Sequence, residues 1–231
     1  MSSRLSLKLQ EISTARRCDV PVGDLVIAGW TGRDKAAVDM HIRELAELGV
    51  RPPARTPIFY RVAASLLTTE ESVDVIGMDS TGEVEFVLLN HDGKWWVGVG
   101  SDHTDREVET VGVTISKQLC PKPLAPELWS FDDIESHWDE LVLRSYAVSG
   151  SARELYQEGS VSAMRYPREL VELYRQSTAR DFSPGTVMFG GTLPVKNGIR
   201  WADTFVIEIE DPVLRRTIAH SYACRALPVE G

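Results

Sequence analysis

Hydrophobic and polar residues alternate at the start of the chain, where leucines at positions 5, 7 and 9 are separated by polar side chains. A period of two predicts a strand, and residues 20–30, with a turn at Gly23, are predicted to form a second strand. After Asp34 the period becomes helical, because apolar residues recur at positions 38, 42, 45 and 48. Asp34 can cap this helix and Gly49 is placed to end it, so a short β-rich arm and one helix open the chain.

The proline-rich segment 51–57 is predicted to be an extended linker, because each proline disfavours helix in the residue before it. Beyond it we predict one clear helix at 166–176 and a hairpin turn at 91–93. Strand patterns dominate the remainder, at residues 58–62, 83–89, 95–100, 141–148, 186–190, 204–210 and 216–227. Without β-α-β alternation or an internal repeat, the pattern predicts an α+β, β-rich fold with a mixed or antiparallel sheet. We divide it into an N-terminal arm and helix, 1–56, and a main domain, 57–231.

Composition narrows the class of protein. The 231 residues suffice for one large domain or for an arm plus a domain, and the hydrophobic share of 43% is ordinary for a soluble globular protein. The net charge of −9, without clustered lysine or arginine, argues against nucleic-acid binding. No stretch approaches the roughly 18 apolar residues of a membrane helix. The three cysteines are too far apart to indicate a disulfide or a zinc site, so we expect a cytoplasmic protein.

Glu83 and Glu85 carry the first candidate chemistry. They lie one residue apart in an otherwise apolar strand, so their side chains point to the same face. Two like charges side by side repel, and burial adds a desolvation cost, so a cation should lie between them. Asp102, after the strand at 95–100, can add a third carboxylate, and three oxygen ligands suit Mg²⁺ or Mn²⁺ with positions left for water and substrate. The alternative is a solvated strand edge and a turn-forming aspartate.

Further residues are candidates for catalysis or binding. His41 and Glu44 lie one helical turn apart, the spacing at which a carboxylate can orient an imidazole as a general base, although such pairs are common on exposed helices. Gly191 and Thr192 follow a predicted strand and offer a backbone N–H and a hydroxyl to a carboxylate, unless they form only a turn. Lys117 taken alone is an ordinary lysine, more often solvated than part of an active site.

Taken in chain order, these pieces resemble the fumarylacetoacetate hydrolase superfamily over residues 25–227. That family shows a His-x-x-Glu lid segment, a proline-rich lead into a strand, a Glu-x-Glu strand, an Asp-containing turn that ends in arginine, a lysine before prolines, and Pro-Gly-Asp followed by Gly-Thr-Pro. Each motif is weak alone, but six in the family's order are collectively strong. The counterparts are His41 with Glu44; Pro57-Ile58-Phe59; Glu83 with Glu85; Ser101 to Arg106; Lys117 before Pro121, Pro123 and Pro126; and Pro184-Gly185-Thr186 with Gly191-Thr192.

The resemblance implies a mixed β-sandwich roll with a short N-terminal arm and a lid helix, commonly assembled as a homodimer. It assigns the metal to Glu83, Glu85 and Asp102, the acid/base pair to His41 and Glu44, the developing oxyanion to Lys117, and the substrate carboxylate to Gly191 and Thr192. Arg106 can pair with a substrate carboxylate or with a neighbouring acid. The lid lacks the family's asparagine-tyrosine, Thr186 replaces the aspartate of Pro-Gly-Asp, and Leu193 interrupts Gly-Thr-Pro, which indicates a divergent branch.

The sequence therefore predicts a Mg²⁺- or Mn²⁺-dependent hydrolase that cleaves a carbon–carbon bond in a small 2-oxo or β-diketo acid, with water activated by His41 and Glu44. The same site would serve a hydratase, a decarboxylase or a tautomerase. A non-catalytic module that binds a carboxylated ligand is the alternative from another class. A two-carboxylate glycosidase is disfavoured, because Glu83 and Glu85 lie on one strand, too close to flank a sugar bond.

Overall fold

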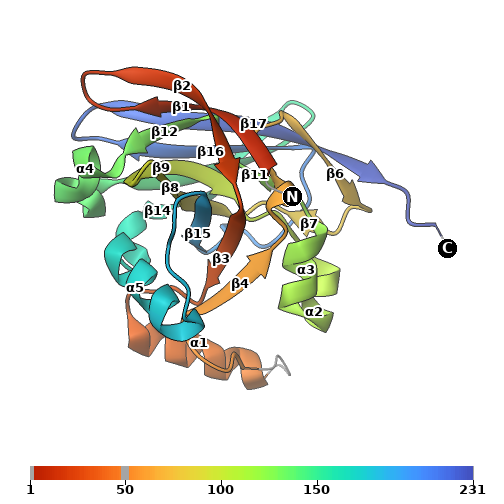
Figure 1. Ribbon diagram of the computed structural model, residues 1–231. Coiled ribbons are helices and arrows are strands. Elements are labelled where there is room, and N and C mark those ends of the chain that lie inside the picture. The colour runs from red at the N-terminus through yellow and green to blue at the C-terminus, as the bar shows by residue number, and fades with distance from the viewer. Residues whose placement is uncertain (1–2, 48–51, 231) are drawn as a thin grey trace.

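The computed structural model describes residues 3–47 and 52–230, apart from the side chains of residues 41 and 44–47. Within these ranges the chain forms two large sheets with a shared core and helices at their edges (Figure 1). The predicted β-rich α+β class and mixed pairing are confirmed. None of the described helices combines the length and the apolar character that crossing a membrane requires.

The larger sheet has eight strands within the described residues. In spatial order they are β2 (Ala15–Val22), β1 (Ser3–Gln10), β12 (Glu127–Ser130), β9 (Lys94–Ser101), β8 (Val84–His91), β15 (Thr186–Thr192), β3 (Asp24–Gly29) and β4 (Ile58–Val62). The pairs β1–β12 and β15–β3 are parallel and the others are antiparallel. Because β3 pairs with β4, strands on both sides of residue 56 share this sheet, and the division of the chain at that point stays a prediction.

The smaller sheet packs its inner face against the larger one. Its described strands are, in order, β14 (Ala152–Ser160), β13 (Val142–Ser149), β16 (Thr204–Asp211), β17 (Arg216–Leu227) and β6 (Ser72–Ile76). Two short pairs complete the β-structure and consist of β10 (Thr104–Asp105) with β7 (Ser80–Thr81), and β11 (Lys122–Pro123) with β5 (Leu67–Thr68).

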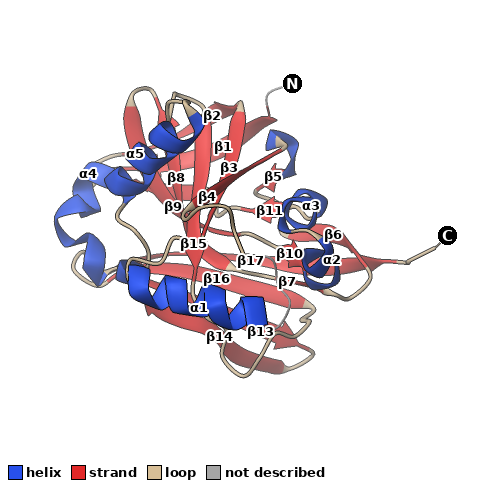
Figure 2. Ribbon diagram, turned by 90° about the horizontal axis from the view of Figure 1, so that it is seen from below, coloured by secondary structure: helices blue, strands red, loops and turns tan. Residues whose placement is uncertain are grey.

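Helices lie around the sheets rather than between them. Figure 2 shows α4 (Phe131–Ile134) and α5 (Pro167–Thr178) on one side, and α2 (Arg106–Val111) and α3 (Val113–Leu119) on the opposite side. The helix α1 (Lys35–Glu47) lies far from β1 and β2 in Figure 1. Three short 3₁₀ turns within the described residues are η1 (Ala64–Leu66), η2 (Glu135–Glu140) and η3 (Val161–Ala163).

Strand β8 is buried on both faces, which explains its nearly continuous apolar sequence. Phe86 and Leu88 face the core between the two sheets, where Phe86 packs edge-on against Trp138 with ring centroids 5.1 Å apart. Val87 and Leu89 face a second core beneath β1 and β2. Each such side chain stabilises the fold by roughly 1.5–3 kcal/mol through burial. By alternation Glu85 shares the face of Val87, so its carboxylate is placed in the interior.

Candidate metal centre

Three carboxylates converge where the β8–β9 hairpin ends. Oxygen atoms of Glu83, Glu85 and Asp102 lie within 4.8 Å of one another. Glu83 precedes β8 and Asp102 follows β9, and the hairpin register places their main chains in contact, with the Asp102 N–H donating to the Glu83 carbonyl at 3.0 Å. Glu85 is 2% exposed and Asp102 is 0% exposed. The structure thus brings together the three carboxylates that the sequence singled out as metal ligands.

Glu85 is held by the main chain of β15. Its Oε2 accepts a hydrogen bond of 2.7 Å from the N–H of Gly191, at a bulge where the pairing of β15 with β8 shifts. Gly191 has φ of 103°, and a Cβ there would lie 1.8 Å from Thr31 Oγ1, so the position requires glycine. Burial, reinforced by the charges of Asp102 and Glu83, raises the pKa of Glu85 well above its ordinary value.

Lys117, on α3, reaches two of the three carboxylates. Its Nζ contacts Asp102 Oδ2 and lies 3.3 Å from Glu83 Oε2. The preceding helix, α2, is capped by Asp105, whose carboxylate accepts the Val108 N–H at 2.9 Å. Burial alone would lower the pKa of Lys117, but Asp102 and Glu83 raise it above the ordinary value, so the ammonium is charged. This lysine is buried rather than solvated.

Lys122, in β11, is a second buried cation that the motifs did not reveal. Its side chain is 0% exposed, and its Nζ lies 3.0 Å from Asp102 Oδ1 and donates to the His103 carbonyl at 2.6 Å. Burial alone would raise the pKa of Asp102, but Lys117 and Lys122 together lower it below the ordinary value. The signal that could have identified it is a lone lysine in the otherwise uncharged segment 118–126.

Arg106, the first residue of α2, lies among acidic and polar partners. It donates from Nη1 to Glu83 Oε1 at 3.0 Å and to Glu109 Oε2 at 2.9 Å, and from Nε to Thr81 Oγ1 at 2.8 Å. Burial opposes its charge, but Glu83 and Glu109 raise its pKa further above the ordinary value. Of the two partners that the sequence left open, the structure shows neighbouring acids, and a role in substrate binding stays a prediction.

Gln157, in β14, joins the strands around the centre and was also missed, because β14 itself was not predicted. Its side chain is fully buried and uses both polar atoms. The Oε1 accepts from the Val84 N–H at 2.9 Å and from Ser145 Oγ at 3.0 Å, while Nε2 donates to Thr192 Oγ1 at 2.8 Å and to the Leu193 carbonyl at 2.6 Å. Thr192 in turn donates to the Val84 carbonyl at 2.9 Å, and its role toward a substrate carboxylate stays a prediction.

The predicted helix carrying His41 and Glu44 is present as α1. Asp34 caps it by accepting two main-chain N–H groups, at 2.9 and 3.1 Å. The side chains of His41 and Glu44 lie outside the described part of the structure, so their predicted pairing stays a prediction. The chain that leads into α1 adjoins the centre, because Thr31 lies against Gly191.

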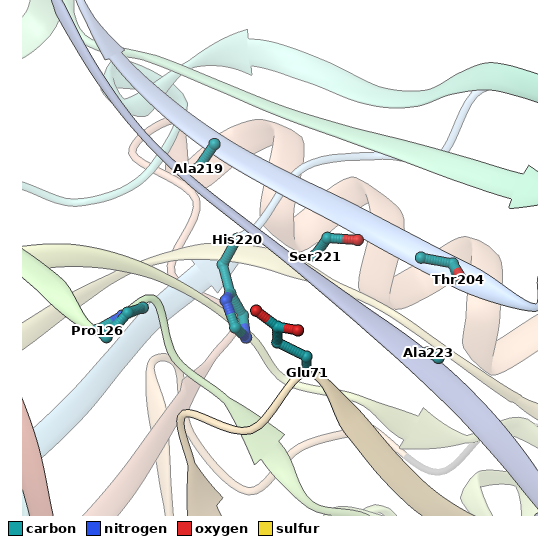
Figure 3. Close-up of a pocket in the computed structure, with 7 residues that line it drawn as sticks. All are labelled: Glu71, Pro126, Thr204, Ala219, His220, Ser221 and Ala223. Atoms are coloured by element: carbon teal, nitrogen blue, oxygen red, sulfur yellow. The ribbon is translucent and has the colours of Figure 1, made fainter.

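A separate hollow of about 460 Å³ contains none of the predicted site residues (Figure 3). Figure 3 shows the imidazole of His220 and the carboxylate of Glu71 reaching toward each other. The His220 ring is already engaged by the main chain, with Nε2 3.2 Å from the Glu70 carbonyl oxygen. The residues around this hollow are Glu71, Pro126, Thr204, Ala219, His220, Ser221 and Ala223.

The carboxylate triad fits a hard divalent cation. All three donors are oxygens, the preferred ligands of Mg²⁺, Mn²⁺ and Ca²⁺. Glu85 is the strongest indication, because it is buried and accepts a main-chain N–H rather than a lysine or arginine. An ion bound beside it would offset the burial, and the repulsion by Asp102 and Glu83, that raise the pKa of Glu85.

Solved structures of similar fold align with most of this chain. A 2-keto-3-deoxy-D-arabinonate dehydratase complexed with magnesium and 2,5-dioxopentanoate has a TM-score of 0.60 at 17% identity, over 94% of this chain and 78% of that chain. A fumarylacetoacetate hydrolase from psychrophilic Exiguobacterium antarcticum has a TM-score of 0.57 at 19% identity, over 94% and 83%. A 4-oxalocrotonate decarboxylase from Pseudomonas putida G7, complexed with magnesium and adipate, has a TM-score of 0.58 at 14% identity, over 88% and 79%.

The fold is similar to that of a fumarylacetoacetate hydrolase, which confirms the resemblance inferred from the motifs at the level of the fold. Within that fold the chain belongs to the family described as Protein of unknown function (DUF2848), whose sequence profile matches residues 28–222. No curated protein matches the chain.

Proposed function

We propose that the protein is a divalent-metal-dependent enzyme that acts on a small 2-oxo or β-diketo acid. The observation that carries the proposal is the triad of Glu83, Glu85 and Asp102, two of them buried and Glu83 partly so, with Lys117 against it. Proteins of similar fold whose structures contain magnesium together with a dicarbonyl or dicarboxylate molecule support the choice of cation and of substrate class. A cation held there supplies Lewis-acid polarisation of a 2-oxo group, and Mg²⁺ or Mn²⁺ matches the donor set.

The reaction that we favour is hydrolysis of an acylpyruvate. One water adds to the distal carbonyl, the adjacent carbon–carbon bond breaks, and the products are a carboxylic acid and pyruvate, formed when its enolate takes up a proton. We assign removal of the water proton to His41, oriented by Glu44, as their spacing on α1 suggests. Lys117 faces the oxygen on which negative charge develops, since its ammonium is charged and fixed by two carboxylates.

Elimination of water and decarboxylation are the second candidates, because enzymes named for both reactions share this fold. All three reactions place negative charge next to a 2-oxo acid, so the same triad and Lys117 serve each of them. The difference lies in whether water attacks the substrate. Arg106, Gly191 and Thr192 remain our candidates for the substrate carboxylate.

We also propose a cytoplasmic homodimer as the working form of the enzyme. Support comes from apolar side chains on α2 and α3, at four-residue spacing, that are unusually exposed: Val111 (79%), Ile115 (54%) and Leu119 (42%). A second copy of the chain would cover them. Light scattering at micromolar concentration tests this directly, with a monomeric mass as the result that contradicts it.

The function is tested by incubating the protein with acylpyruvates, 2-keto-3-deoxy acids and unsaturated 2-oxo diacids in Mg²⁺ or Mn²⁺, with products identified by mass spectrometry. Hydrolysis adds one water to an acylpyruvate, dehydration removes one from a deoxy acid, and decarboxylation releases carbon dioxide. We expect turnover that chelators abolish and that His41→Ala and Glu85→Gln lower by at least two orders of magnitude. Specific binding of these acids without turnover by the wild type would favour a non-catalytic module, and full activity of His41→Ala would overturn its assigned role.

A further inference from the structure

Lys122 is buried more completely than Lys117, which is 7% exposed. Its ammonium lies 3.0 Å from Asp102 Oδ1 and donates to the carbonyl of the next residue, His103, at 2.6 Å, and the whole side chain is 0% exposed. Strand β11 is itself tied by parallel pairing to β5, with Lys122 opposite Leu67. An amine held by two neighbouring acceptors inside the core has no freedom to follow a ligand.

The two lysines contact different oxygens of Asp102. Lys117 approaches Oδ2, the oxygen that also lies on the side of Glu83, whereas Lys122 approaches Oδ1. Lys117 is therefore positioned toward the shared space of the triad. Lys122 contacts a single carboxylate of the triad, so its effect on the centre must act through Asp102.

The other two carboxylates show the same arrangement. One oxygen of Glu85, Oε2, accepts the Gly191 N–H at 2.7 Å, and one oxygen of Glu83, Oε1, accepts Arg106 Nη1 at 3.0 Å. Three unrelated donors, a backbone amide, a guanidinium and an ammonium, each engage one oxygen of one carboxylate. The second oxygens of Asp102 and Glu83 both contact Lys117 Nζ and so lie toward the space that the three carboxylates share.

We propose that Lys122 is a positioning residue that restricts Asp102 to binding a divalent cation through one oxygen, Oδ2. The inference rests on the proposed metal centre and explains why a cation bound there would keep coordination positions free for substrate and water. A carboxylate can bind with one or two oxygens, and Mg²⁺ or Mn²⁺ prefers about six ligands. Three single-oxygen ligands leave three positions, enough for a two-atom chelate by a 2-oxo acid and one water, whereas a two-oxygen Asp102 would leave only two.

The test uses Mn²⁺ alone as the probe and no substrate. Water-proton relaxation counts the exchangeable waters on bound Mn²⁺, while electron paramagnetic resonance of free Mn²⁺ gives the affinity. In Lys122→Met the apolar side chain frees Oδ1, and we expect one bound water fewer than in the wild type, a fall of about one third in relaxation enhancement per bound ion. Lys94→Met is the matched control, because Lys94 is paired with Glu11 at 2.6 Å at the opposite end of β9.

An unchanged water count in a folded, Mn²⁺-binding Lys122→Met protein would overturn the inference. If that variant does not fold, the wild type decides: about three waters per Mn²⁺ support it, and two or fewer refute it. Absence of Mn²⁺ binding by the wild type would instead refute the proposal that the triad is a metal centre. Three waters without turnover of any 2-oxo acid would leave Lys122 in its role and refute only the proposed reaction.

Discussion

Replacing Asp102 with asparagine tests how far the buried cations depend on one carboxylate. The substitution keeps the size of the side chain but removes its negative charge. Lys122, which is fully buried, would retain only the His103 carbonyl as a partner. The Lys117 ammonium would still lie 3.3 Å from Glu83 Oε2, so Glu83 partly compensates for the lost charge of Asp102. The cost therefore arises chiefly from Lys122.

The expected magnitude follows from these contacts. Removing one member of a buried ion pair costs about 3–5 kcal/mol, because a buried charge is left uncompensated. The asparagine carbonyl still accepts a hydrogen bond from one lysine, which recovers ~1 kcal/mol. We expect Asp102→Asn to lower the free energy of unfolding by ~2–4 kcal/mol, which corresponds to a decrease in Tm of roughly 4–16 °C for a chain of this size.

The assay is thermal and urea unfolding at pH 7 in the presence of a chelator, so that metal binding does not contribute. Asp92→Asn is the control, because Asp92 is an exposed turn residue paired at 3.4 Å with the exposed Arg16. Surface pairs of this kind contribute little, and asparagine tolerates the positive φ of 54° at this position. A loss below ~1 kcal/mol in Asp102→Asn, with the m value unchanged, would refute the reasoning about Lys122.

Three further changes probe the centre and its surroundings. Glu85→Gln should stabilise the metal-free protein, because the amide oxygen still accepts the Gly191 N–H without the buried charge, and should abolish the rise in Tm on adding Mg²⁺. Gly191→Ala should cost at least ~2 kcal/mol in urea unfolding, since its Cβ would meet Thr31 at positive φ. Burial lowers the pKa of His220 below its ordinary 6.5, so the unfolded chain binds the proton first. Stability is then lost as pH falls through 6.5, and urea titrations at pH 7.5 and 5.5 should show a smaller loss for His220→Gln.

Local patterns predicted the elements whose burial follows a simple period. The predicted ranges 58–62 and 216–227 coincide with β4 and β17, since one face of each strand is buried. Strand β14 (Ala152–Ser160) was missed, because its first half is exposed and charged and its buried positions, Tyr156 and Gln157, are adjacent. The short helix α2 was missed because its start depends on a cap by Asp105 rather than on an apolar stripe.

Local patterns were equally limited in predicting the candidate metal centre. Glu83, Glu85 and Asp102 lie within one hairpin, so alternation and a turn were enough to predict that they meet. Lys122 and Gln157 act through contacts that the topology creates between remote strands. No period or motif marks Gln157, and the only signal for Lys122 is its place as a lone lysine in the uncharged segment 118–126. Sequence reasoning therefore predicted correctly that these three carboxylates meet, while the residues that support them required the fold.

The strand order also governs when the centre can form during synthesis. The three carboxylates belong to one hairpin, but the N–H that holds Glu85 comes from Gly191, which lies 106 residues later in the chain. At about 5–20 residues per second, a ribosome needs about 5–20 s to cover that interval. Strand β15 must then enter between β8 and β3, both made long before. Such non-local pairing folds slowly, so a nascent chain carries its acidic hairpin without the β15 contact, and metal binding should mark the completed protein rather than guide its folding.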